Sequence, residues 1–228
     1  MAKVFLDAGH GGKDAGAVGN GLKEKDINLS VTLKIGEILK SHGIEVVYSR
    51  VNDVFIELSD IAKKANNSKA DIFVSIHCNS FRYSSAKGME TYSYPNSLQG
   101  SKLSKNIYDS IIKDKVYTAN RGTKTENFAV LRLTNMPATL VELAFISNSQ
   151  DAYILKNRQR ELALAVAKGI LNNLGIKYRA ELVKLDKPEE NLDGKVYKVQ
   201  VGVFSDIKNA EKLISELKSK GYEAIIVN

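Results

Sequence analysis

Several features that mark other classes of protein are missing from this sequence of 228 residues. Cys78 is the single cysteine, so the chain holds no internal disulfide, which suits a reducing compartment. There is no tryptophan and no patch of interleaved basic and aromatic residues, so we expect no nucleic-acid binding. No apolar run approaches the ~18 residues that a membrane-spanning helix needs, so we expect no membrane insertion.

The N-terminus also lacks the apolar core of a signal peptide, because MAKVFLDAGH has only a three-residue apolar block before charge returns. We therefore expect the protein to be made in the cytoplasm without an export signal. The net charge is +7 and the lysines are scattered rather than clustered. This excess favours polyanionic surroundings, whether nucleic acid or an anionic cell-wall polymer, and does not by itself select between them.

The spacing of apolar residues predicts alternating helices and strands over most of the chain. Strands are expected at 44–49, 71–77, 88–94, 128–133 and 138–145, after a first strand at 4–6, and helices at 27–39, 58–66, 103–112 and 149–174. Such alternation is typical of an α/β fold with a mostly parallel central sheet flanked by helices on both faces. Ligands of these folds bind beyond the carboxyl ends of the strands.

The opening stretch 4–24, VFLDAGHGGKDAGAVGNGLKE, is rich in glycine after the short apolar run 4–6 of the first strand. Glycines in such numbers indicate backbone that bends tightly or approaches another group closely. His10 and Glu24 are the best metal-binding side chains of the stretch. A metal site on the loop that leaves the first strand and a long surface loop are equally open interpretations of this stretch alone.

The chain has three histidines, so their positions are informative. His42 precedes Gly43 at a predicted helix end, and we interpret it as a surface cap favoured by the helix dipole. His77 ends a buried strand, where a lone histidine is usually a hydrogen-bonded core residue unless a second ligand converges on it. His10 follows the first strand, so the predicted sheet topology brings it to the same edge as His77 and makes it the candidate second ligand. Cys78 faces the opposite side of its strand from His77, so we interpret it as a small buried hydrophobe.

Two histidines and one carboxylate are a donor set of catalytic zinc sites, in which three protein ligands leave one position open. Glu24, which ends the glycine-rich loop, is the expected third ligand. Glu142 lies within the apolar stretch ATLVELAF, where an isolated carboxylate is costly unless it is paired or lies near a cation. It is either a general base beside the metal or the partner of Arg132 or Lys124 in an ion pair.

The segments LDAGHGGKDAGAVGNGLKE, ANNSKADIFVSIHCNS and NFAVLRLTNMPATLVELAFISN occur in an order that resembles the zinc-dependent N-acetylmuramoyl-L-alanine amidases of the type 3 family. The resemblance implies one Zn²⁺ ion on His10, Glu24 and His77, with Glu142 as the catalytic carboxylate. Asn79 follows the second histidine as in the family, and is expected to contact substrate or to orient a ligand. The implied activity is cleavage of the amide between N-acetylmuramic acid and L-alanine of the peptidoglycan stem peptide.

The chain departs from the family pattern at three positions that are neither ligand nor base. Ala15 stands where the family usually has proline, Ile61 where it has arginine, and Ala144 where it has glycine. Ile61 puts an ion pair on a helix surface in doubt, and Ala144 indicates altered packing beside Glu142.

We place the catalytic domain at 1–175. After its last predicted helix the composition of the chain changes. A polar linker is expected at 176–194 and a small β-α-β unit at 195–228, whose helix has the apolar residues Ala210, Leu213, Ile214 and Leu217. The unit resembles half of a sporulation-related repeat (SPOR) domain, a peptidoglycan-binding module. About 34 residues bury too little apolar surface to fold alone. We favour a homodimer through 195–228, with docking on the catalytic domain or a chain cut short as alternatives, and a glycan-binding or purely dimerising role left open.

The sequence therefore predicts a peptidoglycan hydrolase, either an autolysin or a phage endolysin. A zinc peptidase acting on peptidoglycan cross-links and a non-catalytic wall-binding protein remain as alternatives. Without an export signal, such an enzyme would reach the cell wall after lysis of the cell, as in a sporulating mother cell, or by passage through a phage-encoded membrane hole.

Overall fold

The computed structural model describes residues 1–117, 119–183, 202, 204, 206–219 and 226. The chain divides into two compact units, Met1–Lys184 and Leu185–Asn228. In the described part of the chain, no helix combines the length and the apolar character that a bilayer crossing requires.

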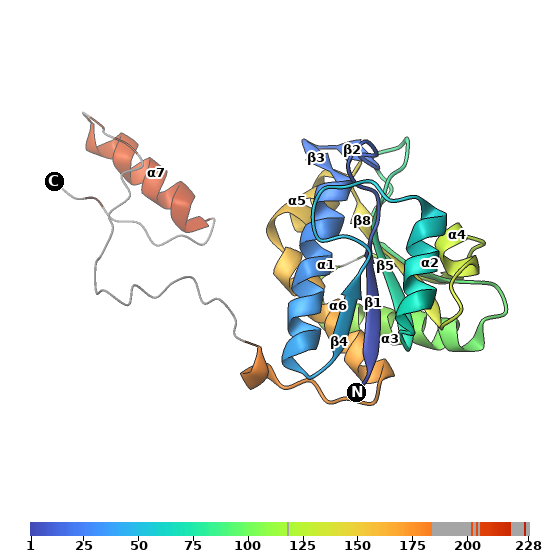
Figure 1. Ribbon diagram of the computed structural model, residues 1–228. Helices are drawn as coiled ribbons and strands as arrows, with labels where there is room; N and C mark the ends of the chain where they lie inside the picture. Colours follow the sequence, from blue (N-terminus) through green and yellow to red (C-terminus); the bar gives the residue numbers. More distant parts are fainter. Residues whose placement is uncertain (118, 184–201, 203, 205, 220–225, 227–228) are drawn as a thin grey trace. The chain divides into compact units, whose positions relative to one another are not determined.

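A six-stranded sheet forms the centre of the larger unit (Figure 1). Its strands are β1 (Lys3–Ala8), β4 (Glu45–Tyr48), β5 (Ile72–Asn79), β6 (Met89–Ser93), β7 (Asn120–Thr125) and β8 (Ala138–Phe145). Their order across the sheet is β4-β1-β5-β8-β6-β7. Every neighbouring pair is parallel except β6 and β8, so the prediction of a mostly parallel sheet is confirmed.

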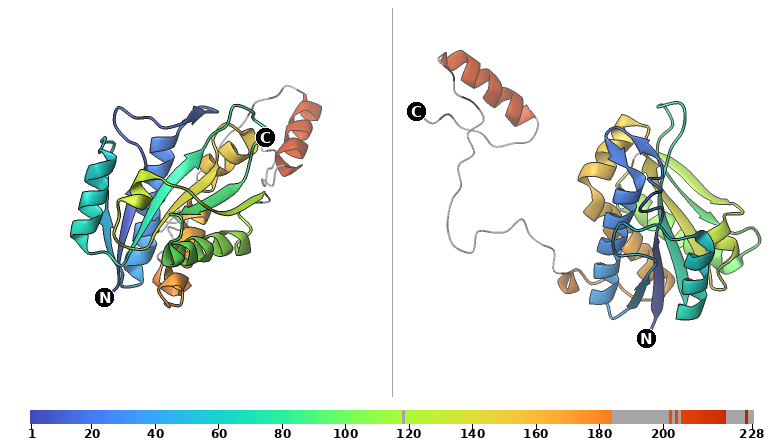
Figure 2. Two further views of the ribbon diagram at one scale, coloured as in Figure 1. Left: turned by 90° about the vertical axis from the view of Figure 1, so that its right-hand side faces the viewer. Right: turned by 45° about the horizontal axis from the view of Figure 1, so that its top comes forward.

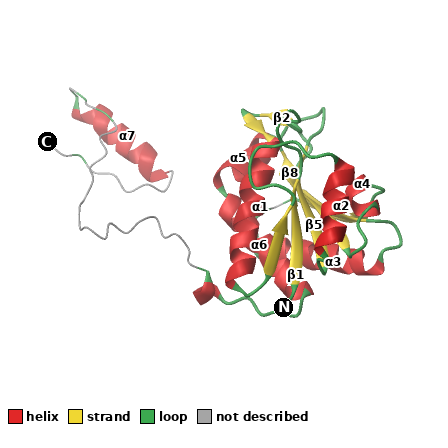
Figure 3. Cartoon of the chain, viewed as in Figure 1, coloured by secondary structure: helices red, strands yellow, loops and turns green. Residues whose placement is uncertain are grey.

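Helices cover both faces of this sheet, as Figures 2 and 3 show. The larger apolar core lies under α1 (Glu24–Ser41), α3 (Leu98–Lys113) and α6 (Gln159–Asn173). The smaller core, on the opposite face, lies under α2 (Leu58–Ser68) and the short helix α4 (Ala129–Arg132). Another helix, α5 (Ser149–Asn157), follows β8.

Alternate residues of the central strands enter the two cores, which explains why β1 and β5 are apolar on both faces. Val4 and Leu6 face the larger core, whereas Phe5 faces the smaller one. Phe5 is in register with Phe73 of β5, and their rings stack with centroids 5.5 Å apart. The same register brings the carboxyl ends of β1, β5 and β8 to one edge of the sheet.

Two predicted elements are wrong. The predicted strand at 128–133 is the helix α4, in which Val130 and Leu131 are buried in the smaller core. The strand at the edge next to β6 is β7, which the sequence did not predict. Its polar sequence NRGTKT is largely exposed and has no alternation of apolar and polar residues. The predicted single helix at 149–174 is two helices, α5 and α6, which meet at Arg158.

Two residues that we associated with a helix surface are buried. Ile61, where the resemblance put a helix-surface ion pair in doubt, is 5% exposed and packs in the smaller core. His42 is indeed the C-cap residue of α1, but it is only 9% exposed because its ring stacks on Tyr178, with centroids 5.3 Å apart. The backbone N–H of Arg179 donates to His42 Nε2 at 3.0 Å. Residues 176–183, including a 3₁₀ turn at Ala180–Leu182, thus run along the larger unit.

Helix α7 (Ile207–Ser219) is the main described element of the smaller unit. It confirms the predicted helix, and the four apolar residues of its predicted face are partly covered: Ala210, Leu213, Ile214 and Leu217. The strands predicted on either side of it lie almost entirely outside the described residues.

Candidate metal centre and active site

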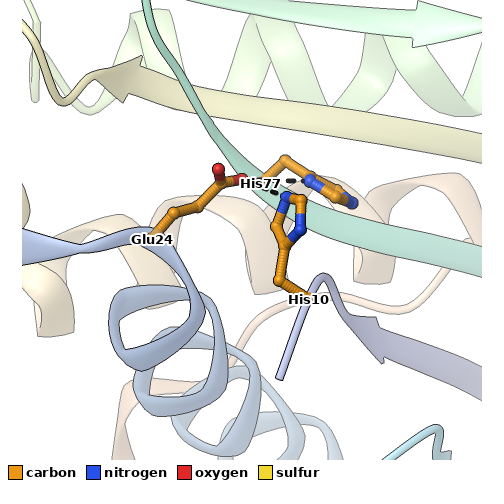
Figure 4. Close-up of side chains that lie close together, drawn as sticks. All are labelled: His10, Glu24 and His77. Carbon is orange, nitrogen blue, oxygen red and sulfur yellow. Dashed lines mark hydrogen bonds and ion pairs between the residues drawn. The ribbon is translucent and has the colours of Figure 1, made fainter. Parts of the chain in front are cut away.

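Three side chains from separate elements converge at the carboxyl edge of the sheet (Figure 4). His10 lies in the loop after β1, Glu24 is the first residue of α1, and His77 lies in β5. Glu24 Oε1 is 3.2 Å from Nε2 of His10 and 3.0 Å from Nδ1 of His77. The three residues each offer one ligand atom, and these atoms lie within 4.8 Å of one another. The structure therefore brings together the three residues that the sequence proposed as a metal site.

Glycines allow this close approach. His10 itself has a positive φ of 63°, at the turn that carries the chain away from β1. A β-carbon at Gly9 would lie 2.2 Å from Cε1 of His77, and one at Gly16, which has φ +62°, would lie 2.6 Å from Oε2 of Glu24. The glycine-rich loop is thus shaped around the candidate ligands, which favours the metal-site interpretation of this stretch over a long surface loop.

Hydrogen bonds from the surrounding chain hold the candidate ligands in place. Asp14 Oδ2 lies 2.8 Å from Nδ1 of His10, so it fixes the ring with Nε2 towards Glu24. Glu24 Oε2 accepts the backbone N–H of Ala17 at 2.8 Å, and Oε1 accepts that of Cys78 at 2.9 Å. Cys78 itself is buried on the other face of β5, as predicted, with its thiol 3.4 Å from Asn28 Oδ1.

The electrostatics are those of a carboxylate shared by two imidazoles. Burial alone would raise the pKa of Glu24, but its contacts with His10 and His77 outweigh burial and hold that pKa well below its usual range. The hydrogen bond with Glu24, opposed by partial burial, raises the pKa of His10 to about 9. Burial opposes protonation of His77, yet Glu24 and Glu142 together raise its pKa. A divalent cation would replace the protons that these groups share.

Glu142 lies on the neighbouring strand, in register with His77. Its Oε2 atom is buried and has no hydrogen-bond partner among the described residues. Burial raises the pKa of Glu142 to about 7. The alternative ion pairs do not form, because Lys124 contacts Glu90 and Arg132 donates to Asn127 Oδ1 at 2.6 Å.

Sequence reasoning missed two acidic residues of the site. Asp14 stands in the glycine-rich stretch, where no sequence pattern marks it as the partner of His10. Glu90 lies in β6, buried and opposite Glu142, and the signal for it was an acidic residue within the strand sequence METYS. Asn79 donates its side-chain amide to Glu90 Oε1 at 2.6 Å, and its own Oδ1 accepts the backbone N–H of Ser80.

The sequence profile of the family described as N-acetylmuramoyl-L-alanine amidase matches residues 4–172. This chain belongs to the N-acetylmuramoyl-L-alanine amidase family. The matched stretch contains the six-stranded sheet except for its first residue, Lys3, and all the candidate site residues of the amidase. A SPOR domain profile also matches, over residues 141–228, so the two matches overlap in β8, α5 and α6.

The relatives of the amidase include a sporulation-specific enzyme and a phage endolysin. The amidase is 37% identical over 229 residues to the sporulation-specific N-acetylmuramoyl-L-alanine amidase of Bacillus subtilis (strain 168), covering 100% of this chain and 85% of that protein. It is 41% identical over 206 residues to the endolysin of Bacillus phage SPP1, covering 87% of this chain and 75% of the endolysin.

The fold is shared with solved amidases. The catalytic domain of CwlV, an N-acetylmuramoyl-L-alanine amidase from Bacillus (Paenibacillus) polymyxa var. colistinus, superposes with a TM-score of 0.73 at 39% identity. The match covers 78% of this chain and 100% of that domain. The α/β architecture predicted from the sequence is therefore that of the family.

Proposed function

We propose that this chain is a zinc-dependent hydrolase that cleaves the amide between N-acetylmuramic acid and L-alanine in peptidoglycan. The observation that carries the proposal is the convergence of His10, Glu24 and His77 beside Glu142, in a chain of the amidase family. Two imidazole nitrogens and one carboxylate oxygen fit Zn²⁺, which takes three protein ligands in catalytic sites. The Oε2 atom of Glu142, which is buried and has no hydrogen-bond partner in the described part of the chain, fits the same assignment, since a nearby cation would compensate its burial.

In this proposal His10 Nε2, Glu24 Oε1 and His77 hold a single ion, and Asp14 fixes the orientation of the first of them. When bound, zinc would supply a Lewis acid that polarises the scissile carbonyl. Glu142 accepts a proton from the attacking water and delivers it to the leaving nitrogen of L-alanine. A pKa of about 7 suits both transfers at neutral pH, because a general acid-base group works best when its pKa lies near the working pH.

Digestion of purified cell wall tests the proposal by identifying the bond that is broken. Mass spectrometry of the soluble products is expected to find free stem peptides with L-alanine at their N-terminus, together with glycan that carries the free lactyl carboxylate. New amines at the cross-link instead would identify a cross-link peptidase. Sacculi that bind the protein and release nothing would identify a wall-binding protein without catalysis.

The relatives named for sporulation and for a phage endolysin support a role as an autolysin or as an endolysin. In either role the enzyme made in the cytoplasm would meet peptidoglycan after lysis, or after passage through a membrane hole that a phage encodes.

We further propose that residues 1–175 form the catalytic domain, 176–194 a linker whose first residues, 176–183, pack on that domain, and 195–228 a half SPOR unit that pairs two chains. The support is the SPOR match and the partly covered apolar face of α7, which residues such as Leu213 and Ile214 form. Light scattering at micromolar concentration is expected to report a dimer, and the double substitution Leu213→Asp and Ile214→Asp a monomer. Lys208→Asp, at an exposed position of the same helix, serves as the control. A wild-type chain that is purely monomeric would refute the pairing.

A further inference from the structure

A second buried carboxylate lies beside Glu142. Glu90 of β6 is only 2% exposed and is directly opposite Glu142 in the antiparallel register of β6 and β8. The Cβ atoms of such a pair are roughly 5 Å apart, on the same face of the sheet. Glu90 Oε2 contacts Nε of Arg121 at 2.8 Å and Nζ of Lys124. Both cations come from the edge strand β7.

Both carboxylate oxygens of Glu90 have partners, so the residue takes part in a hydrogen-bond network as well as in ion pairs. Its other oxygen, Oε1, accepts the amide of Asn79 at 2.6 Å and the hydroxyl of Tyr92 at 2.8 Å. Burial would raise the pKa of Glu90, but its contacts with Lys124, Arg121 and Tyr92 hold it below the usual range. Glu90 is therefore a buried negative charge that contacts four side chains of this cluster.

The guanidinium of Arg121 makes two contacts within the described part of the chain. Its Nε pairs with Glu90, and its Cζ lies 4.8 Å from the ring centroid of Phe145, at the carboxyl end of β8. Among the described residues, neither of its two Nη atoms has a hydrogen-bond or ion-pair partner. The side chain as a whole is 37% exposed, so it is partly accessible to solvent. A planar fork presented in this way matches the two oxygens of a carboxylate.

The charge balance of the cluster also favours an anion. Arg121 and Lys124 bring two positive charges, and Glu90 compensates one of them. Glu142 forms no ion pair with either cation among the described residues, although it is the neighbour of Glu90 in the sheet. A net positive charge thus stands within one strand of the proposed general base, on side chains that are 37% and 38% exposed.

We propose that Arg121, positioned by Glu90 and assisted by Lys124, binds a carboxylate of the substrate's stem peptide. The inference rests on the proposed function, because that function places the stem peptide at this edge of the sheet. In peptidoglycan the residue after L-alanine is acidic and is joined to the next residue through its side-chain carboxyl. Its α-carboxylate is therefore free, close in the chain to the scissile amide, unless it is amidated. Arg121 would distinguish the free carboxylate from the amide.

Binding to a non-hydrolysing chain tests this directly. The full-length zinc-loaded Glu142→Gln variant is titrated calorimetrically with two synthetic muramyl peptides that differ only in a carboxylate or a carboxamide at the second residue. We expect the carboxylate peptide to bind about 10-fold more tightly. Adding Arg121→Gln is expected to remove this preference, and Arg121→Lys to retain part of it. Arg132→Gln, which removes an exposed positive charge of α4 that does not touch Glu90, should leave the preference intact.

Steady-state hydrolysis gives a second readout that a purely structural role of Arg121 would not produce. In a chain with Glu142 intact, Arg121→Gln is expected to raise KM for the carboxylate peptide and to leave kcat, and KM for the carboxamide peptide, nearly unchanged. Equal affinity of the Glu142→Gln chain for both peptides overturns the proposal, and so does equal weakening of both by Arg121→Gln. Absence of hydrolysis by the wild-type chain would count against the proposed function alone, since the binding comparison does not need turnover.

Discussion

Replacing Glu142 with glutamine is expected to reduce hydrolysis of cell wall by roughly 10²–10⁴-fold or more, the range that general acid-base groups contribute. Glutamine has nearly the same shape but can neither accept the proton of the attacking water nor return it to the leaving nitrogen. The carboxylate is not among the three groups that converge on one another, so the variant should bind as much zinc as the wild type. Release of N-terminal L-alanine measures the first effect, and elemental analysis the second.

A matched control for this experiment is Glu37→Gln, because Glu37 is an exposed carboxylate of α1 and its replacement changes the net charge equally. It should hydrolyse wall at the wild-type rate. If Glu142→Gln turned over near that rate too, the catalytic assignment of Glu142 would be wrong. If it lost its zinc instead, Glu142 would have to be counted among the groups that hold the ion.

The sequence predicted those parts of the fold whose burial is evident from their own apolar residues. β1 and β5 lie in the middle of the sheet with helices over both faces, so their residues are apolar without alternation. The edge strand β7 has no such pattern, because most of its residues are exposed and its role is to pair with β6. Tertiary pairing alone makes it a strand. The apolar residues Val130 and Leu131 suggested a strand nearby, but a single helical turn buries them as well.

The candidate ligands were predictable for the same topological reason. His10 follows β1 and His77 lies near the end of the adjacent parallel strand, so the two rings had to meet at one edge, and their centroids are 5.0 Å apart. Glu24 followed from the donor chemistry that two histidines require. His42 was misjudged as a surface residue because its cover, Tyr178, comes from a segment that the sequence marked as a polar linker.

The network around Glu90 could not be predicted from spacing. Its two cations are 31 and 34 residues further along the chain, on the strand that the sequence did not reveal. The register of β6 against both β7 and β8 determines that Glu90 stands between these cations and Glu142. A buried acidic residue in a strand was the available signal, and only the structure supplies its partners.

His77→Ala is expected to lower the zinc content of the purified chain from about one ion to near background. Removing a group that merely supports a ligand typically weakens metal binding 10–100-fold, so removing one of three proposed ligands should weaken it more. His42→Gln is the matched control, since His42 is a buried histidine whose partners are Ser41, Tyr178 and backbone groups rather than the candidate site. Elemental analysis after dialysis measures both variants, with circular dichroism to confirm that each is folded.

The pH dependence of metal uptake gives the same assignment a second test. The pKa of His10 is about 9 without metal, so below that pH a proton competes with zinc for the ring. At limiting zinc, occupancy of the wild-type chain should therefore rise with pH and level off near pH 9. The competing proton is bound because Glu24 contacts the ring, so the ligand set that attracts the metal also sets this dependence. A His77→Ala chain that kept one ion, or an occupancy that fell as the pH rose to 9, would mean that these imidazoles do not hold the metal.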